Sequence, residues 1–127
     1  MPRVRFGRVH VFNNYYHAPG NNNCLRAAIA SEVLVEGNYF DSVKNVWELY
    51  RTTGEDGKVF AANNLQVNTS WSAGTDSSSI QIPGTDILSG EANGLNPVPY
   101  AYSPDVASVV PNLVTNGAGA GRGPFAP

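Results

Sequence analysis

Two arginines close to the start of the chain, Arg3 and Arg5, combine a residue type and a spacing that could do chemistry. A guanidinium group stays charged and presents a planar fork that can bind a carboxylate through two hydrogen bonds. Residues two apart in a β-strand project from the same face, so in a strand these side chains would form a small cationic site. The alternative is that both are solvated residues near a frayed end of the chain.

Other reactive groups are isolated in the sequence. His10 alternates with Val9 and Val11, so it is expected to point away from their buried face. Its intrinsic pKa would suit a general base. His17 is expected in a surface turn, and the single cysteine, Cys24, is expected to be buried as a small hydrophobe.

The acidic residues do not show the spacing of a metal-binding loop. Calcium prefers several oxygen ligands that converge, and no segment supplies them at short intervals. The stretch GEDG at 54–57 is most simply a turn, and the glycosylation sequon at Asn68 has little weight by itself. The carboxylates considered are Glu32, Glu36, Asp41, Glu48, Glu55, Asp56 and Asp76. The sequence therefore predicts no metal ligands.

Length and composition indicate one turn-rich domain. The chain has 127 residues, of which 14% are charged, and its net charge of −2 gives no electrostatic footprint for nucleic acid or an anionic membrane. No apolar run is long enough to cross a bilayer, and the basic start lacks the apolar segment of a secretory signal. With one cysteine, an internal disulfide is excluded.

A short pattern occurs three times. VHVFNNYY at 9–16, VLVEGNYF at 33–40 and VFAANNLQ at 59–66 share alternating apolar residues, then Asn or Gly, then Asn, then an apolar residue. The offsets between copies are 24 and 26 residues, a period typical of solenoids. Alternation with a period of two indicates strands with one inward face, and Asn or Gly tolerates the bend that follows.

These repeats predict an all-β fold, a parallel β-helix of about three coils. Asn14, Asn38 and Asn64 would stack as a hydrogen-bonded ladder, with Tyr15, Tyr39 and Leu65 as an apolar stack beside it. The alternative is chance similarity within an ordinary β-sandwich. The segment SVKNVWELYR at 42–51 is interpreted as a strand rather than an amphipathic helix.

The remainder of the chain is expected to close the fold. We expect coils over about 1–71, and a packed loop and C-terminal cap over about 72–127, within a single domain at 1–127. Asp105 could cap a brief helix that carries Val106, Val109 and Val110 on one side and covers the last coil. The tail GAGAGRGPFAP is expected to be mobile.

PRVRFGRVHVFNNYY, followed by VLVEGNYF, resembles the pectate lyases of polysaccharide lyase family 1, and PYAYSPDVASVVPNLVTNGAGAG resembles their C-terminal end. The resemblance implies a right-handed parallel β-helix that cleaves polygalacturonate (pectin) by calcium-dependent β-elimination outside the cell. Arg5 matches the family arginine that holds a substrate carboxylate, so Arg5 and Arg3 are the candidate catalytic and substrate-binding residues. The residues in register with the family signature are Pro2, Arg3, Val4, Arg5, Gly7, His10, Asn13 and Asn14.

This sequence also differs from the family pattern in ways that bear on activity. Only the C-terminal portion of the family is matched, and its catalytic arginine would fall before Met1. Its assisting lysine and calcium-binding aspartates also lie upstream, so we expect a truncated β-helix. Family members carry a histidine at the position of His10 without using it as the base, which favours a structural hydrogen bond.

Two functions remain open at this point. The first is a pectate-lyase-derived protein that cleaves or binds polygalacturonate, with weak or no turnover and with calcium as the implied cofactor. The second is a non-catalytic β-helical scaffold that self-assembles and binds galacturonan at most. Because a truncated solenoid exposes strand edges, we also expect a homo-oligomer, either a dimer or a trimer.

Overall fold

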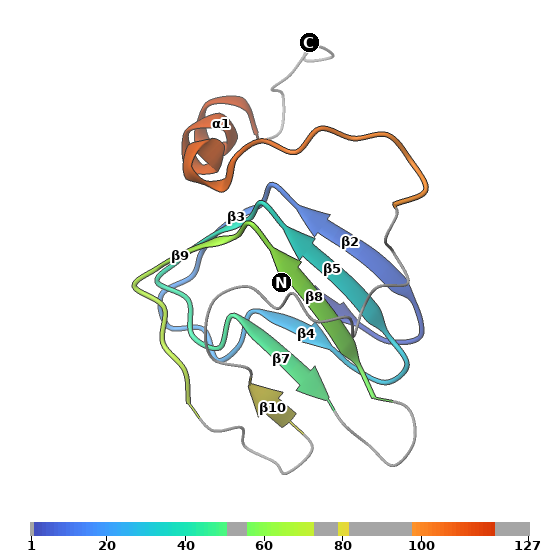
Figure 1. The fold of residues 1–127 in the computed structure, drawn as a ribbon. Coiled ribbons are helices and arrows are strands. Elements are labelled where there is room, and N and C mark those ends of the chain that lie inside the picture. Colours follow the sequence, from blue (N-terminus) through green and yellow to red (C-terminus); the bar gives the residue numbers. More distant parts are fainter. Residues whose placement is uncertain (1, 51–55, 73–78, 82–97, 119–127) are drawn as a thin grey trace.

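The computed structural model describes residues 2–50, 56–72, 79–81 and 98–118, and in these the chain winds into three stacked coils (Figure 1). Each coil gives one short strand to each of three sheets. The first sheet contains β1 (Arg3–Val4), β4 (Leu25–Ala27), β7 (Trp47–Tyr50) and β10 (Ser79–Gln81). The second contains β2 (Arg8–Phe12), β5 (Glu32–Glu36) and β8 (Lys58–Ala62), and the third contains β3 (Tyr15–His17), β6 (Tyr39–Asp41) and β9 (Leu65–Val67).

Neighbouring coils pair in parallel, and the register follows the sequence repeat. Val9 lies beside Val33, and Val33 beside Val59. Among the strands that the structure describes, only β10 runs antiparallel to its neighbour, β7. The architecture is a parallel β-helix, as the repeat predicted, and β7 confirms the strand interpretation for residues 47–50 of the segment 42–51.

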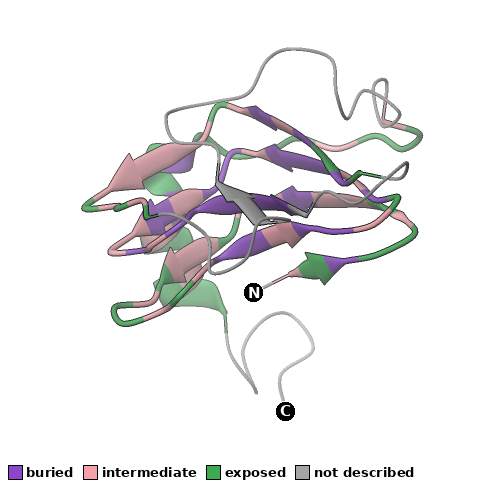
Figure 2. Ribbon diagram, turned by 90° about the horizontal axis from the view of Figure 1, so that it is seen from below, coloured by how far each residue is buried: buried purple, intermediate pink, exposed green. Residues whose placement is uncertain are grey.

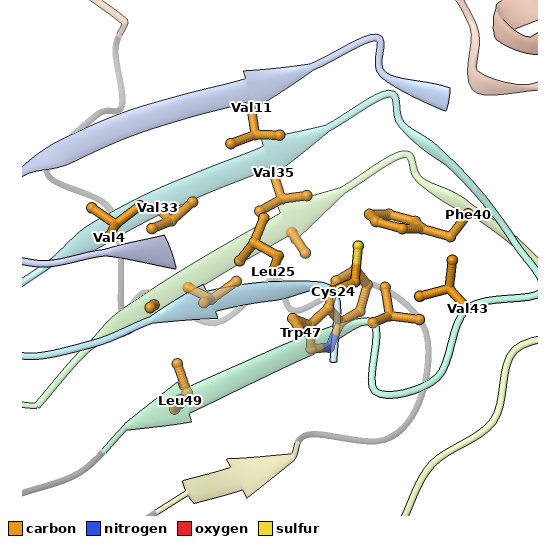
Figure 3. Close-up of a cluster of buried hydrophobic side chains, with 14 residues drawn as sticks. Val4, Val11, Cys24, Leu25, Val33, Val35, Phe40, Val43, Trp47 and Leu49 are labelled. Atoms are coloured by element: carbon orange, nitrogen blue, oxygen red, sulfur yellow. The ribbon is translucent and has the colours of Figure 1, made fainter. Parts of the chain in front are cut away.

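The inward residues of all three sheets form one apolar core (Figures 2 and 3). Aromatic rings continue the stack from coil to coil, with Tyr16 and Phe40 parallel at a centroid distance of 5.1 Å. Phe40 also meets Trp47 edge to face at 5.9 Å. These contacts stabilise the stack because each coil buries its apolar face against the next. Core members include Val11, Cys24, Leu25, Val33, Val35, Phe40, Val43, Val46, Trp47 and Val59.

The bend between the second and third sheets is built from the predicted residues. Asn13, Gly37 and Asn63 occupy it in successive coils, with φ of +53°, +64° and +58°. Only glycine and, to a lesser extent, asparagine adopt this left-handed conformation readily. The next residue in each coil belongs to the asparagine ladder, so the repeat encodes the bend and its hydrogen bonds together.

The ladder itself is confirmed. Oδ1 of Asn38 accepts hydrogen bonds from the backbone N–H and the side-chain amide of Asn14, at 2.9 and 3.2 Å. Oδ1 of Asn64 receives the same pair from Asn38, at 3.0 and 3.1 Å. The Tyr15, Tyr39 and Leu65 stack is also in register, although these side chains are only half-buried on the outer face of the third sheet.

A second corner joins the first sheet to the second. Phe6 and Ala30 occupy it in successive coils, with φ of +53° and +54°. In the third coil Gly57 approaches the second coil so closely that a Cβ there would lie 2.0 Å from the carbonyl oxygen of Ala27. This corner is therefore sterically tight in the third coil and open to solvent at Phe6.

The C-terminal arm, residues 98–118, crosses the outside of the second sheet and ends in α1 (Val110–Gly117), preceded by a 3₁₀ turn at Ala107–Val109 (Figure 1). The helix is present as predicted. Its capping is not, because the 3₁₀ turn begins after Val106 and no side chain caps it, so Asp105 is not the N-cap. Among the described residues, no helix is long and apolar enough to span a membrane.

The arm lies beside the first two coils rather than over the last one. Asn13 holds it, donating to the carbonyl of Asp105 at 2.9 Å and accepting from its N–H at 2.7 Å. The predicted apolar face is also wrong in part, because Val110 is buried whereas Val106 and Val109 are exposed. Most of the predicted packed loop and the predicted mobile tail lie outside the described residues.

Candidate functional site

Arg3 and Arg5 line a common pocket, although only Arg3 lies in a strand. β1 ends at Val4, and Arg5 occupies the bend that follows it. The expectation that both project from one strand is therefore wrong for Arg5. The two side chains nevertheless share a pocket of about 90 Å³ with Arg26 and Ala28, which we call the arginine pocket.

Arg26 belongs to this site and was missed by sequence reasoning. It lies directly beside Arg3 in the register of β1 and β4. Its partner one coil further is Glu48 in β7, and Arg26 Nε lies 3.2 Å from Glu48 Oε1. The side chains of Arg26 and Glu48 are only 15% and 5% exposed, so a largely buried carboxylate holds the guanidinium group that Arg26 gives to the pocket.

The arginine pocket carries a positive charge. Its three guanidinium groups contribute +3 and Glu48 contributes −1, which leaves +2. Arg3 and Arg5 are exposed and make no ion pair with any of the described residues. Their charges are therefore available to an anionic ligand, whereas Arg26 is already neutralised and positioned by Glu48.

His10 is not part of this pocket. It projects outward from β2, where its Nε2 lies 3.0 Å from Glu36 Oε2 and its Nδ1 lies 2.6 Å from the hydroxyl of Tyr100. The ring stacks on Phe12 at 4.6 Å, and its side chain is 3% exposed. The prediction of a structural hydrogen bond is confirmed, and the arm covers the imidazole.

His17 ends β3 rather than occupying a turn, which corrects the prediction. It is on the surface as expected, with its side chain 53% exposed and Nδ1 3.3 Å from Asp41 Oδ2. The Asp41 carboxylate also accepts from Ser42 Oγ at 2.9 Å, so the serine contacts the acid and not the imidazole. This arrangement lacks the serine–histidine contact that Ser42 would need to act as a nucleophile with His17 as its base.

Cys24 is buried and unreactive. It is 2% exposed, as predicted, and burial raises the pKa of its thiol to about 12. Since the thiolate is the nucleophile and the metal ligand, the raised pKa disfavours both roles for Cys24 at neutral pH.

The carboxylates of the described residues do not form a calcium site. Glu32 and Glu36 leave the outer face of β5 toward Arg8 and His10, and Glu48 is held by Arg26. In the part of the chain that the structure describes, no three acidic, histidine or cysteine side chains converge on one point. The donor set thus does not fit the several convergent oxygens that calcium prefers. Glu55 and Asp76 lie outside the described residues.

Structures of known proteins share this fold. Pectate lyase II from Xanthomonas campestris pv. campestris superposes with a TM-score of 0.71 at 23% identity, covering 93% of this chain and 35% of that one. A pectate lyase from Bacillus sp. N165, solved in complex with trigalacturonate, superposes with a TM-score of 0.58 at 24% identity, covering 90% and 34%. At these identities the likeness establishes the fold alone.

Sequence comparisons give the same family. A pectate lyase from Bacillus subtilis is 30% identical over 138 residues, covering 95% of this chain and 28% of the relative. A pectate trisaccharide-lyase from Bacillus licheniformis is 25% identical over 122 residues, covering 96% and 31%. The chain therefore spans about a third of the length of the curated relatives it matches. The family model for pectate lyase matches residues 1–123. Because this match includes nearly the whole chain, the protein belongs to the pectate lyase family.

Proposed function

We propose that the chain binds polygalacturonate through the arginine pocket. The observation that carries the proposal is the convergence of Arg3, Arg5 and Arg26 on one pocket with a charge of +2. Polygalacturonate presents one carboxylate on every sugar, and guanidinium groups bind carboxylates bidentately. Family membership supports the same substrate class, and a related lyase has been solved with trigalacturonate bound.

The same pocket suits the charge that develops in β-elimination. That reaction removes the proton α to the uronate carboxylate, places negative charge on the carboxylate, and then expels the oxygen at the β position. Fixed cations stabilise this charge without reorganising at the moment of reaction. In this proposal Arg5 holds the carboxylate and Arg3 stabilises the developing charge beside it.

Among the described residues, the arginine pocket lacks a good general base for the removal of the proton. An arginine is very hard to deprotonate, so neither Arg3 nor Arg5 is a good base at neutral pH. Glu48 is 5% exposed and is held by Arg26, so it cannot reach a sugar proton. We therefore propose that the chain binds its polymer well and cleaves it slowly. His10 is turned away on another sheet and does not supply the base.

Calcium enters the proposal only as the cofactor implied by the family. Because the described carboxylates do not fit it, no step here is assigned to the metal. Binding by guanidinium groups should then persist in the presence of a chelator. Turnover should be measured twice, once with calcium and once with chelator, to show whether it needs the metal. The readout for turnover is the ultraviolet absorbance of the unsaturated product.

The second candidate function is a non-catalytic scaffold that self-associates. Its supporting observation is that β1, β2 and β3 each lie at the edge of a sheet and pair on one side only among the described residues. Open strand edges favour pairing with another chain, so a homo-oligomer is part of this proposal.

The decisive experiment is calorimetric titration of trigalacturonate in chelator, with the wild type and with Arg5→Gln. Loss of a charged hydrogen bond should weaken binding about 10- to 100-fold. Lys44→Gln, which removes one positive charge outside the pocket, is the matched control and should change affinity little. Equal affinity in wild type and Arg5→Gln would show that the polymer does not use this pocket.

A further inference from the structure

A second concavity, larger than the arginine pocket, lies apart from it. It is a groove of about 510 Å³ at the corner between the first and second sheets. It shares no lining residue with the arginine pocket. Its volume lies in the range of small-molecule sites. The residues that line it are Phe6, Gly7, Arg8, Ala30, Ser31, Glu32, Asp56 and Lys58, and we call it the Phe6 groove.

Phe6 places an aromatic ring in this groove with most of its surface in solvent. Phe6 is 70% exposed, whereas Val4 and Val11 of the same coil are buried in the core. Its backbone is left-handed, with φ of +53°, and its N–H donates to the carbonyl of Ile29 at 2.9 Å.

The fold explains the backbone at this corner but not the ring. Ala30 occupies the equivalent corner in the next coil with φ of +54°, so the bend requires the conformation and not an aromatic side chain. A bulky residue is an unfavourable choice for that region. Exposing the ring gains nothing from burial either. The identity of Phe6 therefore calls for a use outside the fold.

The charges around the ring are balanced. Arg8 and Lys58 contribute +2, and Glu32 and Asp56 contribute −2. Arg8, Glu32 and Lys58 lie in register on consecutive coils, and Arg8 Nε is 3.0 Å from Glu32 Oε2. Lys58 forms no ion pair with the described residues, so its ammonium is available to a ligand.

The groove has an exposed aromatic ring, hydrogen-bond donors and acceptors around it, and no net charge. These properties suit the binding of an uncharged sugar. The apolar face of a pyranose can lie on the ring, while its hydroxyls accept from Arg8 and Lys58 and donate to the acidic side chains. A polyanion would gain little from a groove whose cations are matched by anions, in contrast to the arginine pocket.

We propose that the Phe6 groove binds an uncharged hexose unit of an oligosaccharide, with Phe6 as the stacking platform and Lys58 as a hydrogen-bond donor. This site is independent of the proposed function of the arginine pocket. Consecutive residues, Arg5 and Phe6, belong to the two sites, so one polysaccharide with charged and uncharged units could contact both.

The test compares two matched ligands, galactotriose and trigalacturonate, which differ in the carboxylates of the latter. Backbone amide shifts are followed by NMR for Gly7, Ala30 and Ser31 in the Phe6 groove, and for Arg3 and Arg26 in the arginine pocket. Galactotriose should shift the first set of amides, and trigalacturonate the second. The two sets of amides report on the two sites separately. If one ligand does not bind at its site, binding of the other ligand can still be measured.

Substitutions then identify the ring as the cause. Phe6→Asn tolerates the left-handed backbone but removes the platform, and it should weaken galactotriose binding about tenfold. Phe6→Tyr keeps the ring and should retain binding, and Lys58→Gln should weaken it without touching the core. Leu113→Ala, at another exposed apolar side chain, is the control. The proposal is overturned if galactotriose shifts none of these amides, if Phe6→Asn and Lys58→Gln both bind as the wild type does, or if trigalacturonate occupies this groove more tightly.

Discussion

At the scale of single residues, Asn38 is a buried polar side chain that joins neighbouring coils. Its side chain is fully buried, donates to the carbonyl of Val11 at 2.9 Å and accepts from the backbone N–H of Asn14 at 2.9 Å. It also donates to Asn64, so one amide links three coils. A buried polar group without a partner lowers the free energy of unfolding. Removing one asparagine of the ladder therefore also destabilises the partners that it leaves unsatisfied.

Asn38→Ala should therefore destabilise the protein strongly. The substitution leaves the Val11 carbonyl and the Asn14 N–H without side-chain partners and opens a small cavity. We expect a loss of about 2–4 kcal/mol in the free energy of unfolding, measured by urea denaturation. Asn112→Ala, at an exposed position of α1, is the control and should change stability by less than about 0.5 kcal/mol. A loss at Asn38 no larger than that would contradict this account of the ladder.

The residue scale also shows what the sequence can predict. The ladder and the valines of β2, β5 and β8 were predictable because each repeats with its local pattern at offsets of 24 and 26. Arg26 was not, because the first sheet has offsets of 23 and 22, as in Arg3–Arg26 and Arg26–Glu48. The corners differ in length from coil to coil, so a register read in one sheet does not transfer to another. For that reason, a site whose residues come from neighbouring strands of another sheet cannot be predicted from the repeat.

At the scale of elements, the C-terminal arm is held to the coils by a small polar cluster. Tyr102 donates to Glu36 Oε2 at 2.8 Å, and the same oxygen lies 3.0 Å from Nε2 of His10. Tyr100 completes the cluster at Nδ1 of His10. The prediction of an end cap was wrong because the sequence shows the arm's apolar residues and the outward direction of His10. It does not show that His10, Glu36 and Asn13 bind the arm from the side.

Tyr102→Phe should loosen the arm without unfolding the coils. The phenyl ring keeps the aromatic contacts, but Glu36 loses a hydrogen-bond donor. We expect faster hydrogen exchange at the Asp105 N–H, which in the wild type donates to Oδ1 of Asn13. Tyr39→Phe, on another sheet, is the control. Unchanged exchange at Asp105 in Tyr102→Phe would show that the cluster does not hold the arm.

The cluster also predicts a pH dependence for the arm. The hydrogen bond to Glu36 and then burial raise the pKa of Tyr102 from 10.0 to about 12. A raised pKa favours the neutral phenol in the folded state, so this contribution is complete below pH 10 and is lost as the pH rises toward about 12. Exchange at Asp105 should accelerate over that interval in the wild type, beyond the intrinsic rise with pH, and this excess should be absent in Tyr102→Phe.

At the scale of the whole molecule, stability comes from stacking, and the two ends of the stack are not equivalent. In the second coil every strand is paired on both sides, whereas β1, β2 and β3 pair on one side only among the described residues. Val33 and Val59 are 0% and 2% exposed, but Val9, the equivalent residue of the first coil, is only half-buried. Among the described residues, the first coil is thus paired on one side only, and part of the apolar surface of Val9 is exposed there.

A second copy of this 127-residue chain would bury that surface, and the association should depend on Val9. We expect light scattering at micromolar concentration to give a dimer or trimer for the wild type. Val9→Lys places a charge among the edge strands and should shift the species toward monomer, since inward or edge charges block strand pairing. Val106→Lys, at a residue 71% exposed on the arm, is the control and should leave the oligomer intact. Circular dichroism must show folded coils in both variants. A folded, monodisperse wild-type monomer would mean that the first coil is stable with its edges in solvent, and self-association would then be excluded as the function of this surface.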